Sequence, residues 1–219
     1  MMHHSFSRAF FRLTTLIMGA SLLVGGGCLN LGQGSSPPTR FFVLNSLYSF
    51  EKHLTPIANL PDITIGVGPI ALPQYLDRPQ IVTRDSQNEI QMAEFAQWAG
   101  PLKENFASVL AENLSILLAT QRIESFPWNR ALPIDYQIAV EVTRFEGVPG
   151  KNALLRARWT ILDQDGKTVL IKRQSILNEP TGDDQIAALV EAESRTVANL
   201  SREIAAAIKN LAKETAKGK

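Results

Sequence analysis

The spacing of hydrophobic residues changes twice along the chain, and this restricts the fold more than any other feature. Between residues 134 and 178 apolar side chains stand at every second position, which is typical of strands with one buried face. Residues 99–120 before this region and 183–213 after it carry an apolar residue every three or four positions. That spacing predicts two helices with one apolar stripe each. Such stripes need a partner surface to bury them, so we expect both helices to pack on a sheet.

The strands of the second half should form an antiparallel meander. The sequence "QDGK" at 164–167 contains an Asp-Gly pair, which is a strong turn signal between two strands. Apolar residues line one face and polar residues the other, which is the pattern of an antiparallel sheet with one solvated face. Further strands are predicted at 41–47, 62–70, 80–84 and 89–93, and the last two should form a hairpin.

We therefore predict one α/β domain over residues 41–213, in which a mixed, largely antiparallel β-sheet packs against two long α-helices. A chain of 219 residues can bury one sizeable core of this kind. Residues 214–219 follow the domain as a C-terminal tail. The formal net charge is +1, which gives no basic excess for binding nucleic acid.

The first 27 residues have the features of a secretory signal peptide. Arg8 and Arg12 precede a mostly apolar run from Leu13 to Val24, and small residues follow it. The run is shorter than the roughly 20 residues needed to span a bilayer, although a membrane-spanning anchor is the alternative interpretation. We expect residues 1–27 to be removed.

Cys28 is the one cysteine of the chain, so it cannot form an internal disulfide. It follows Gly26 and Gly27 directly, and its place resembles that of the lipid-modified cysteine of bacterial lipoproteins. Gly25 stands where those signals usually carry Leu or Val. The alternative is an ordinary cleaved signal with an incidental cysteine. Residues 28–40 are rich in Gly, Ser and Pro after the cysteine, and we expect them to form a flexible tether.

The sequence offers little for catalysis or metal binding. Of three histidines only His53 lies outside the predicted signal, so a site of clustered His and Cys ligands is not expected. No Gly-x-Ser-x-Gly nucleophile elbow is present. The pair Asp183 and Asp184 is interpreted as a helix cap, and Glu191 with Glu193 as part of an exposed helical face. We predict no catalytic residue, no metal and no cofactor.

The stretch "YLDRPQIVTR" at 75–84 resembles a functional site in composition, yet it contains no nucleophile. It offers an apolar anchor followed by an acid and a base that can pair with each other or with neighbours: Tyr75, Leu76, Asp77 and Arg78. Pro79 favours an extended backbone before it and suits the start of a strand. Two interpretations stay open. The corner fixes the turn and the register of the hairpin, or it contacts a partner subunit or a second copy.

The same stretch, followed by "NEIQMAEFAQWAGPLKENFASVLAENL" and by "FPW" at 126–128, resembles the ABC-type transport auxiliary lipoprotein family of the PqiC type. The likeness continues in "DYQIAVEVTRFEG", "ARWTILD" and the closing helix, and it covers about residues 39–212. The resemblance implies a three-layer α/β sandwich with a mixed sheet, a lipidated Cys28 and no enzymatic activity. It also implies an accessory subunit of an envelope system that moves lipids between the inner and outer membranes and supports membrane integrity.

The partners that the resemblance implies are inner-membrane transporter subunits and a periplasmic protein with MCE domains. The candidate contact residues are Tyr75, Leu76, Asp77, Arg78 and Trp98, although a tryptophan such as the last also suits core packing. Leu29 follows the cysteine where an aspartate would retain a lipoprotein in the inner membrane, so we expect the periplasmic face of the outer membrane. Two other functions stay open: a lipoprotein that assembles an outer-membrane machine, as in lipopolysaccharide export, and a periplasmic hydrolase using carboxylates. A homo-oligomer also stays open.

Overall fold

The computed structural model describes residues 36–51, 53–128 and 133–217. The predicted signal of residues 1–27, Cys28 and the tether as far as residue 35 lie outside the described residues. The chain divides into the units Met1–Pro37 and Pro38–Lys219. The second unit contains all the helices and strands described below.

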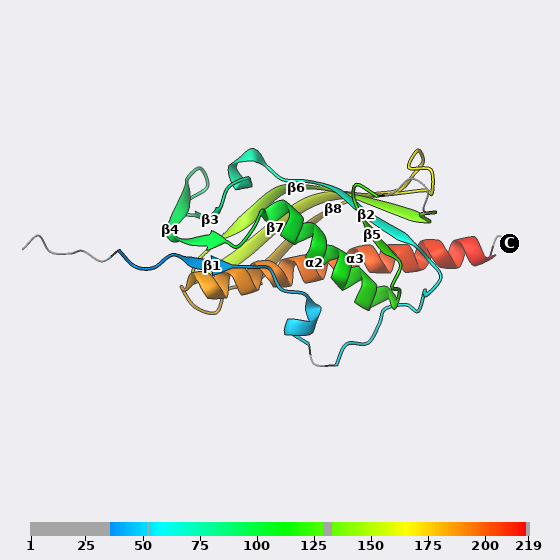
Figure 1. The fold of residues 1–219 in the computed structure, drawn as a ribbon, viewed down its shortest axis with the longest axis horizontal. Helices are drawn as coiled ribbons and strands as arrows, with labels where there is room; N and C mark the ends of the chain where they lie inside the picture. Colours follow the sequence, from blue (N-terminus) through cyan, green and yellow to red (C-terminus); the bar gives the residue numbers. More distant parts are fainter. Residues whose placement is uncertain (1–35, 52, 129–132, 218–219) are drawn as a thin grey trace, which may run out of the picture. The chain divides into compact units, whose positions relative to one another are not determined.

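A mixed sheet of eight strands forms the centre of this unit (Figure 1). The strands are β1 (Arg40–Phe42), β2 (Ile65–Ala71), β3 (Gln80–Arg84), β4 (Ile90–Trp98), β5 (Ile123–Ser125), β6 (Tyr136–Val148), β7 (Asn152–Leu162) and β8 (Val169–Pro180). β6 pairs antiparallel with β7, and β7 pairs antiparallel with β8, which confirms the predicted meander. Gly166, with a φ of +67°, provides the left-handed residue that the β7–β8 turn requires.

The other edge of β6 is shared by two groups of shorter strands. β2 lies between β6 and β5 and is parallel to both. β3 is parallel to β6 at one residue pair and antiparallel to β4, so the predicted hairpin is confirmed. β1 adds a short parallel strand to β4. The sheet is therefore mixed, with its long antiparallel part in the second half of the chain.

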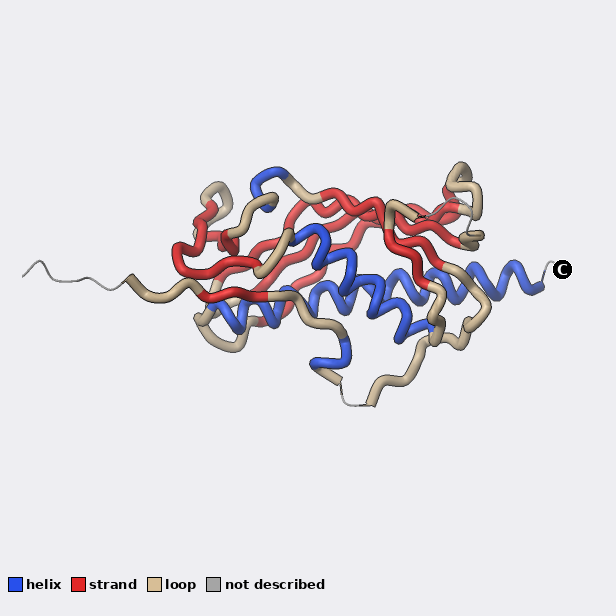
Figure 2. Tube along the Cα trace, viewed as in Figure 1, coloured by secondary structure: helices blue, strands red, loops and turns tan. Residues whose placement is uncertain are grey.

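Two helices, α2 (Leu102–Leu118) and α3 (Ile186–Lys217), cover one face of the sheet (Figure 2). They pack against each other, and α3 also lies against β6, β7 and β8, while α2 contacts β2 and β5. Alternate residues of β7 face this layer and are fully buried: Ala153, Leu155, Ala157, Trp159 and Ile161. The predicted packing of a sheet against two long helices is confirmed. No helix in the described ranges is long and apolar enough to cross a membrane.

An irregular segment, residues 43–51 and 53–63, packs on the side of the helices away from the sheet (Figure 2). The backbone N–H of Leu47 donates to Oδ1 of Asn113 in α2 at 2.8 Å. Nδ2 of the same asparagine donates to Oγ of Ser201 in α3 at 3.2 Å. One buried amide thus joins the segment to both helices. A further bond, from the N–H of Asn45 to Oγ of Ser194 in α3 at 3.1 Å, holds the start of the segment on the helices.

Two expectations about individual segments need correction. The strand predicted at 41–47 is confined to Arg40–Phe42, because the N–H of Leu44 bonds to Oδ1 of Asn105 in α2 at 2.7 Å and not to a strand. Glu193 does not lie on an exposed helical face, since only 1% of it is exposed.

Candidate functional site

Two of the four residues of the predicted corner at 75–78, Asp77 and Arg78, line a groove of about 360 Å³, which we call the corner groove. Its lining residues are Asp77, Arg78, Pro79, Trp98, Gly100, Pro101 and Leu102. Three of the five residues predicted to contact a partner therefore lie in one cavity, although they come from two segments about 20 positions apart.

The corner groove is held together by the β3–β4 hairpin and the start of α2. The N–H of Trp98 donates to the carbonyl oxygen of Pro79 at 2.7 Å, and Gln80 stands opposite Gln97 in the ladder. The N–H of Ala99 donates to the carbonyl oxygen of Phe42 in β1 at 2.9 Å. Pro79 has no N–H to lose at this point, which explains why a proline is tolerated just before the strand. Backbone hydrogen bonds thus hold the chain on both sides of the groove.

Arg78 is the basic residue that lines the groove. Its Nη1 donates to Sδ of Met92 at 2.8 Å, but its Nε is buried and bonds to no group in the described residues. The sequence leaves open whether Asp77 and Arg78 pair with each other or with neighbours, and neither side chain forms an ion pair within the described residues. A buried N–H without an acceptor costs free energy, so the hydrogen-bonding capacity of the Arg78 guanidinium is only partly used within the described residues.

Tyr75 and Leu76 do not line the corner groove. Both belong to the short 3-10 helix η2 (Gln74–Leu76), and only 2% of Leu76 is exposed. The hydroxyl of Tyr75 donates to Oε2 of Glu146 in β6 at 2.7 Å. Because these two side chains are directed inward, we treat them as supports of the corner and limit the proposed partner contact to Asp77, Arg78 and Trp98. Trp98 itself is 6% exposed, so it forms the floor of the groove more than its rim.

Glu146 is the residue on which these supports converge. Its side chain is fully buried and accepts hydrogen bonds from Nε of Arg84 at 2.8 Å, Nε of Arg144 at 2.7 Å and the N–H of Phe145 at 3.0 Å, besides Tyr75. Burial alone would raise the pKa of Glu146, but the bonds from Tyr75 and the two arginines outweigh it and leave that pKa below its ordinary value. Burial, followed by the bond to Glu146, raises the pKa of Tyr75.

Glu193 in α3 is a second buried carboxyl group that the sequence interpretation missed. Its Oε2 has no partner in the described residues. Burial, and then the charge of Glu146, raise the pKa of Glu193 well above its ordinary value, so the protonated form is favoured. A signal for this position was available: it stands three residues after Val190 and four before Val197, both on the buried stripe. Glu146 gave no such signal, because a bulge between Val142 and Arg144 shifts the register of β6 before it.

The chemistry of the corner groove suits binding. Trp98, Pro79, Pro101 and Leu102 supply apolar surface, while the polar ends come from Arg78 and Asp77. The lining contains no serine, cysteine or histidine and only one carboxylate. Acid–base catalysis by paired carboxylates requires two, so these lining residues supply no such pair.

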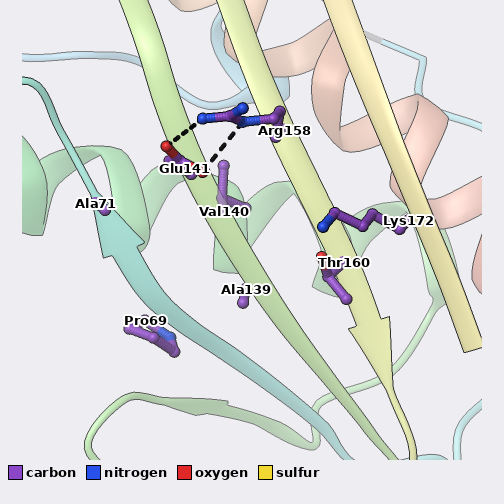
Figure 3. Close-up of a pocket in the computed structure, with 8 residues that line it drawn as sticks. All are labelled: Pro69, Ala71, Ala139, Val140, Glu141, Arg158, Thr160 and Lys172. Atoms are coloured by element: carbon purple, nitrogen blue, oxygen red, sulfur yellow. Dashed lines mark hydrogen bonds and ion pairs between the residues drawn. The ribbon is translucent and has the colours of Figure 1, made fainter. Parts of the chain in front are cut away.

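A second cavity, of about 490 Å³, lies on the face of the sheet away from the helices, and we call it the sheet trough (Figure 3). It is lined by Pro69, Ala71, Ala139, Val140, Glu141, Arg158, Thr160 and Lys172. Figure 3 shows the guanidinium of Arg158 turned toward Glu141, which it binds through Nη2 at 2.5 Å and Nε at 3.1 Å. The alternating pattern predicted a solvated face here but not a cavity, since strands from distant parts of the chain form it.

Two solved structures share the fold. A crystal structure of an uncharacterized protein is 22% identical, with 78% of this chain and 99% of that chain covered and a TM-score of 0.61. A crystal structure of a protein from Xanthomonas campestris is 17% identical, with 81% and 99% covered and a TM-score of 0.65. At these identities the likeness shows the fold alone. A search of curated proteins found no match.

The corner groove, the meander and most of α3 lie within one family match. The family of ABC-type transport auxiliary lipoprotein components matches residues 47–205. This range holds β2 to β8, the whole of α2 and every residue that lines the corner groove and the sheet trough. The chain therefore belongs to the family of ABC-type transport auxiliary lipoprotein components.

Proposed function

We propose that this protein is a non-catalytic accessory subunit of an envelope transport system that moves lipids between the inner and outer membranes and supports membrane integrity. Membership of an auxiliary lipoprotein family supports an envelope location and an association with ABC-type transporter components. The finer assignment adds an acylated Cys28 on the periplasmic face of the outer membrane. It also adds two kinds of partner, an MCE-domain protein and inner-membrane transporter subunits.

The observation that carries this proposal is the corner groove. It combines apolar surface around Trp98 with a guanidinium nitrogen of Arg78 that has no acceptor in the described residues. Energy in protein contacts concentrates in a few aromatic and arginine residues seated in pockets of this kind. The bonds to Glu146 hold the neighbouring η2 and β3 in place, so little order has to be gained when a partner binds.

Capture from detergent-solubilised envelope tests the proposal, with the full lipoprotein as bait. Mass spectrometry should find an MCE-domain protein and an ABC permease enriched on the wild type and depleted on an Arg78→Ala bait. The Lys103→Ala bait, changed at an exposed residue one position beyond the groove, should retain them. Enrichment of lipopolysaccharide-export proteins instead would move the assignment to outer-membrane assembly. A folded wild-type bait that enriches neither group would overturn the proposal.

A further inference from the structure

The sheet trough is built entirely from one layer of the protein. Its lining residues come from β2, β6, β7 and β8, and none comes from a helix or from the corner (Figure 3). Its apolar lining is short: Ala71 is exposed, Ala139 is half-buried and Val140 is buried. Because no second layer closes over it, a small ligand would keep one side in water, whereas small-molecule sites enclose most of their ligand.

One row of side chains crosses the trough in register. Ala139 of β6 stands opposite Thr160 of β7, which stands opposite Lys172 of β8. The next row holds Glu141 opposite Arg158. Figure 3 shows Lys172 beside Thr160, with Arg158 turned away from both toward Glu141. The trough therefore has a methyl group at one end of the row, a hydroxyl in the middle and an ammonium group at the other end.

This face carries more positive charge than its own acids neutralise. Glu141 is paired with Arg158, and Glu146 with Arg84 and Arg144. Lys172 and Arg156 form no ion pair within the described ranges. Arg156 also stands directly opposite Arg144 in the ladder, and its Nε is buried and bonds to no group in the part of the chain that the structure describes.

Like charges directly opposite each other destabilise a pair of strands. The sheet therefore keeps basic side chains in an arrangement that destabilises the folded protein. Such an arrangement is expected of a surface whose neutralising carboxylates come from another molecule.

The shape and the charge of the sheet trough together indicate which kind of molecule binds there. The apolar part of the trough is limited to short side chains such as Ala71 and Ala139, and a volume of about 490 Å³ suits a short chain segment rather than a bilayer surface. A second copy meeting the trough with its own trough would oppose two cationic faces, which is unfavourable. We propose that the sheet trough receives a segment of a partner protein that presents carboxylates beside short apolar side chains. The carboxylates meet Lys172 in the trough and Arg156, which lies beside the trough two residues before Arg158 on β7, and the short side chains rest on the two alanines.

The proposal assumes, with the proposed function, that the protein works with a protein partner, but it uses no residue of the corner groove. A photo-crosslinking amino acid at Thr160 of the full lipoprotein, activated in the intact envelope, tests it directly. The control carries the same amino acid at Asn210, an exposed residue of α3. We expect mass spectrometry to map the Thr160 crosslink to a partner segment with carboxylates next to the crosslinked residue.

Charge exchange then decides whether the contact is the one proposed. Lys172→Glu should lower the crosslink yield about tenfold, and replacing the mapped carboxylate of the partner by lysine should restore it. Lys213→Glu, a reversal at another exposed lysine, should leave the yield unchanged. Ala139→Trp should fill the trough and abolish the crosslink in a protein that still melts cooperatively.

Three results would overturn the proposal: a Thr160 yield no higher than that of Asn210, crosslinks only to lipid, or crosslinks only to a second copy. Failure of the proposed function would look different. The transporter subunits would then be missing from the capture experiment with the wild-type and Arg78→Ala baits, whatever the Thr160 crosslink contacts. An acidic segment mapped on an unrelated envelope protein would support the trough and count against the transport assignment.

Discussion

The hydroxyl of Tyr75 donates a 2.7 Å hydrogen bond to Oε2 of Glu146, a residue 71 positions later in the chain. This bond joins η2 to the central strand β6, and Arg84 adds β3 through its own bond to the same carboxylate. The bonds of Tyr75 and Arg84 to the buried carboxylate of Glu146 therefore hold the segment at 77–79 in place. Its binding surface and its support consist of different residues, so mutations can separate the two roles.

Tyr75→Phe removes this hydrogen bond and keeps the ring. We expect the free energy of unfolding to fall by about 1–2 kcal/mol, because a buried acceptor loses one of its donors. Denaturant unfolding measures it. Tyr48→Phe is the matched control, since Tyr48 is 66% exposed and should change stability little. Equal stability of both variants and the wild type would show that the bond contributes nothing.

Glu193→Gln should remove a dependence of stability on pH. Burial, followed by the charge of Glu146, raises the pKa of Glu193 in the folded protein, so the unfolded chain loses this proton at lower pH. Its stabilising contribution is therefore complete below the unfolded pKa and declines as the pH rises from there toward the folded pKa. The variant should match the wild type near pH 4 and exceed it in urea midpoint near pH 7. A constant difference between the two pH values would contradict this account.

The sequence predicted those parts of the fold that depend on local spacing. Alternation and the Asp-Gly turn were sufficient for the β6–β7–β8 meander, and the strand predicted at 80–84 has the bounds of β3. Parallel partners were beyond reach, because β2 joins β5 and β6 across gaps of more than 50 residues and no turn signal records this. β5 was missed for another reason: a strand of three residues is too short to show a hydrophobic period.

The candidate site was predicted in part, and the division has a physical cause. The sequence identified Asp77 and Arg78 as candidate contact residues beside a proline, and both line the corner groove. It could not place Tyr75, because an amphipathic ring suits a surface contact and a buried hydrogen bond equally well. Nor could it find the sheet trough, whose lining comes from four strands spread over residues 69–172.

Gly147→Ala should destabilise the protein by about 1–3 kcal/mol, because an added methyl group overpacks the contact between β6 and α3. A Cβ at this position would lie 2.4 Å from the carbonyl oxygen of Asn152 and 2.6 Å from Cδ1 of Leu189. Thermal and urea unfolding measure the effect. Gly100→Ala is the control, since a Cβ there meets nothing within 4 Å. Equal midpoints for the two variants would mean that α3 shifts away at no cost.

Arg78→Ala should weaken partner capture by roughly 1–3 kcal/mol while changing the unfolding midpoint little. Among residues 36–51, 53–128 and 133–217 the side chain donates to one sulfur and its Nε has no acceptor, so the fold loses little when the side chain is removed. Titration of the captured partner measures the binding free energy, and thermal unfolding of the same preparation measures the midpoint. If the midpoint drops and the lost binding tracks the unfolded fraction, the corner serves only to fix the turn.

Cys28→Ser should release the protein from the membrane fraction and abolish incorporation of a fatty-acid probe. The expectation rests on the place of Cys28 after Gly26 and Gly27 and before a segment rich in Gly, Ser and Pro. One acyl chain binds a bilayer only marginally, so stable anchoring requires more than one chain on the cysteine. Labelling and flotation on a density gradient check both points, and Ser35→Cys in the Cys28→Ser background tests whether a cysteine elsewhere in the tether can substitute. Equal labelling of the wild type and Cys28→Ser would show that the first 27 residues are an ordinary cleaved signal or a membrane anchor.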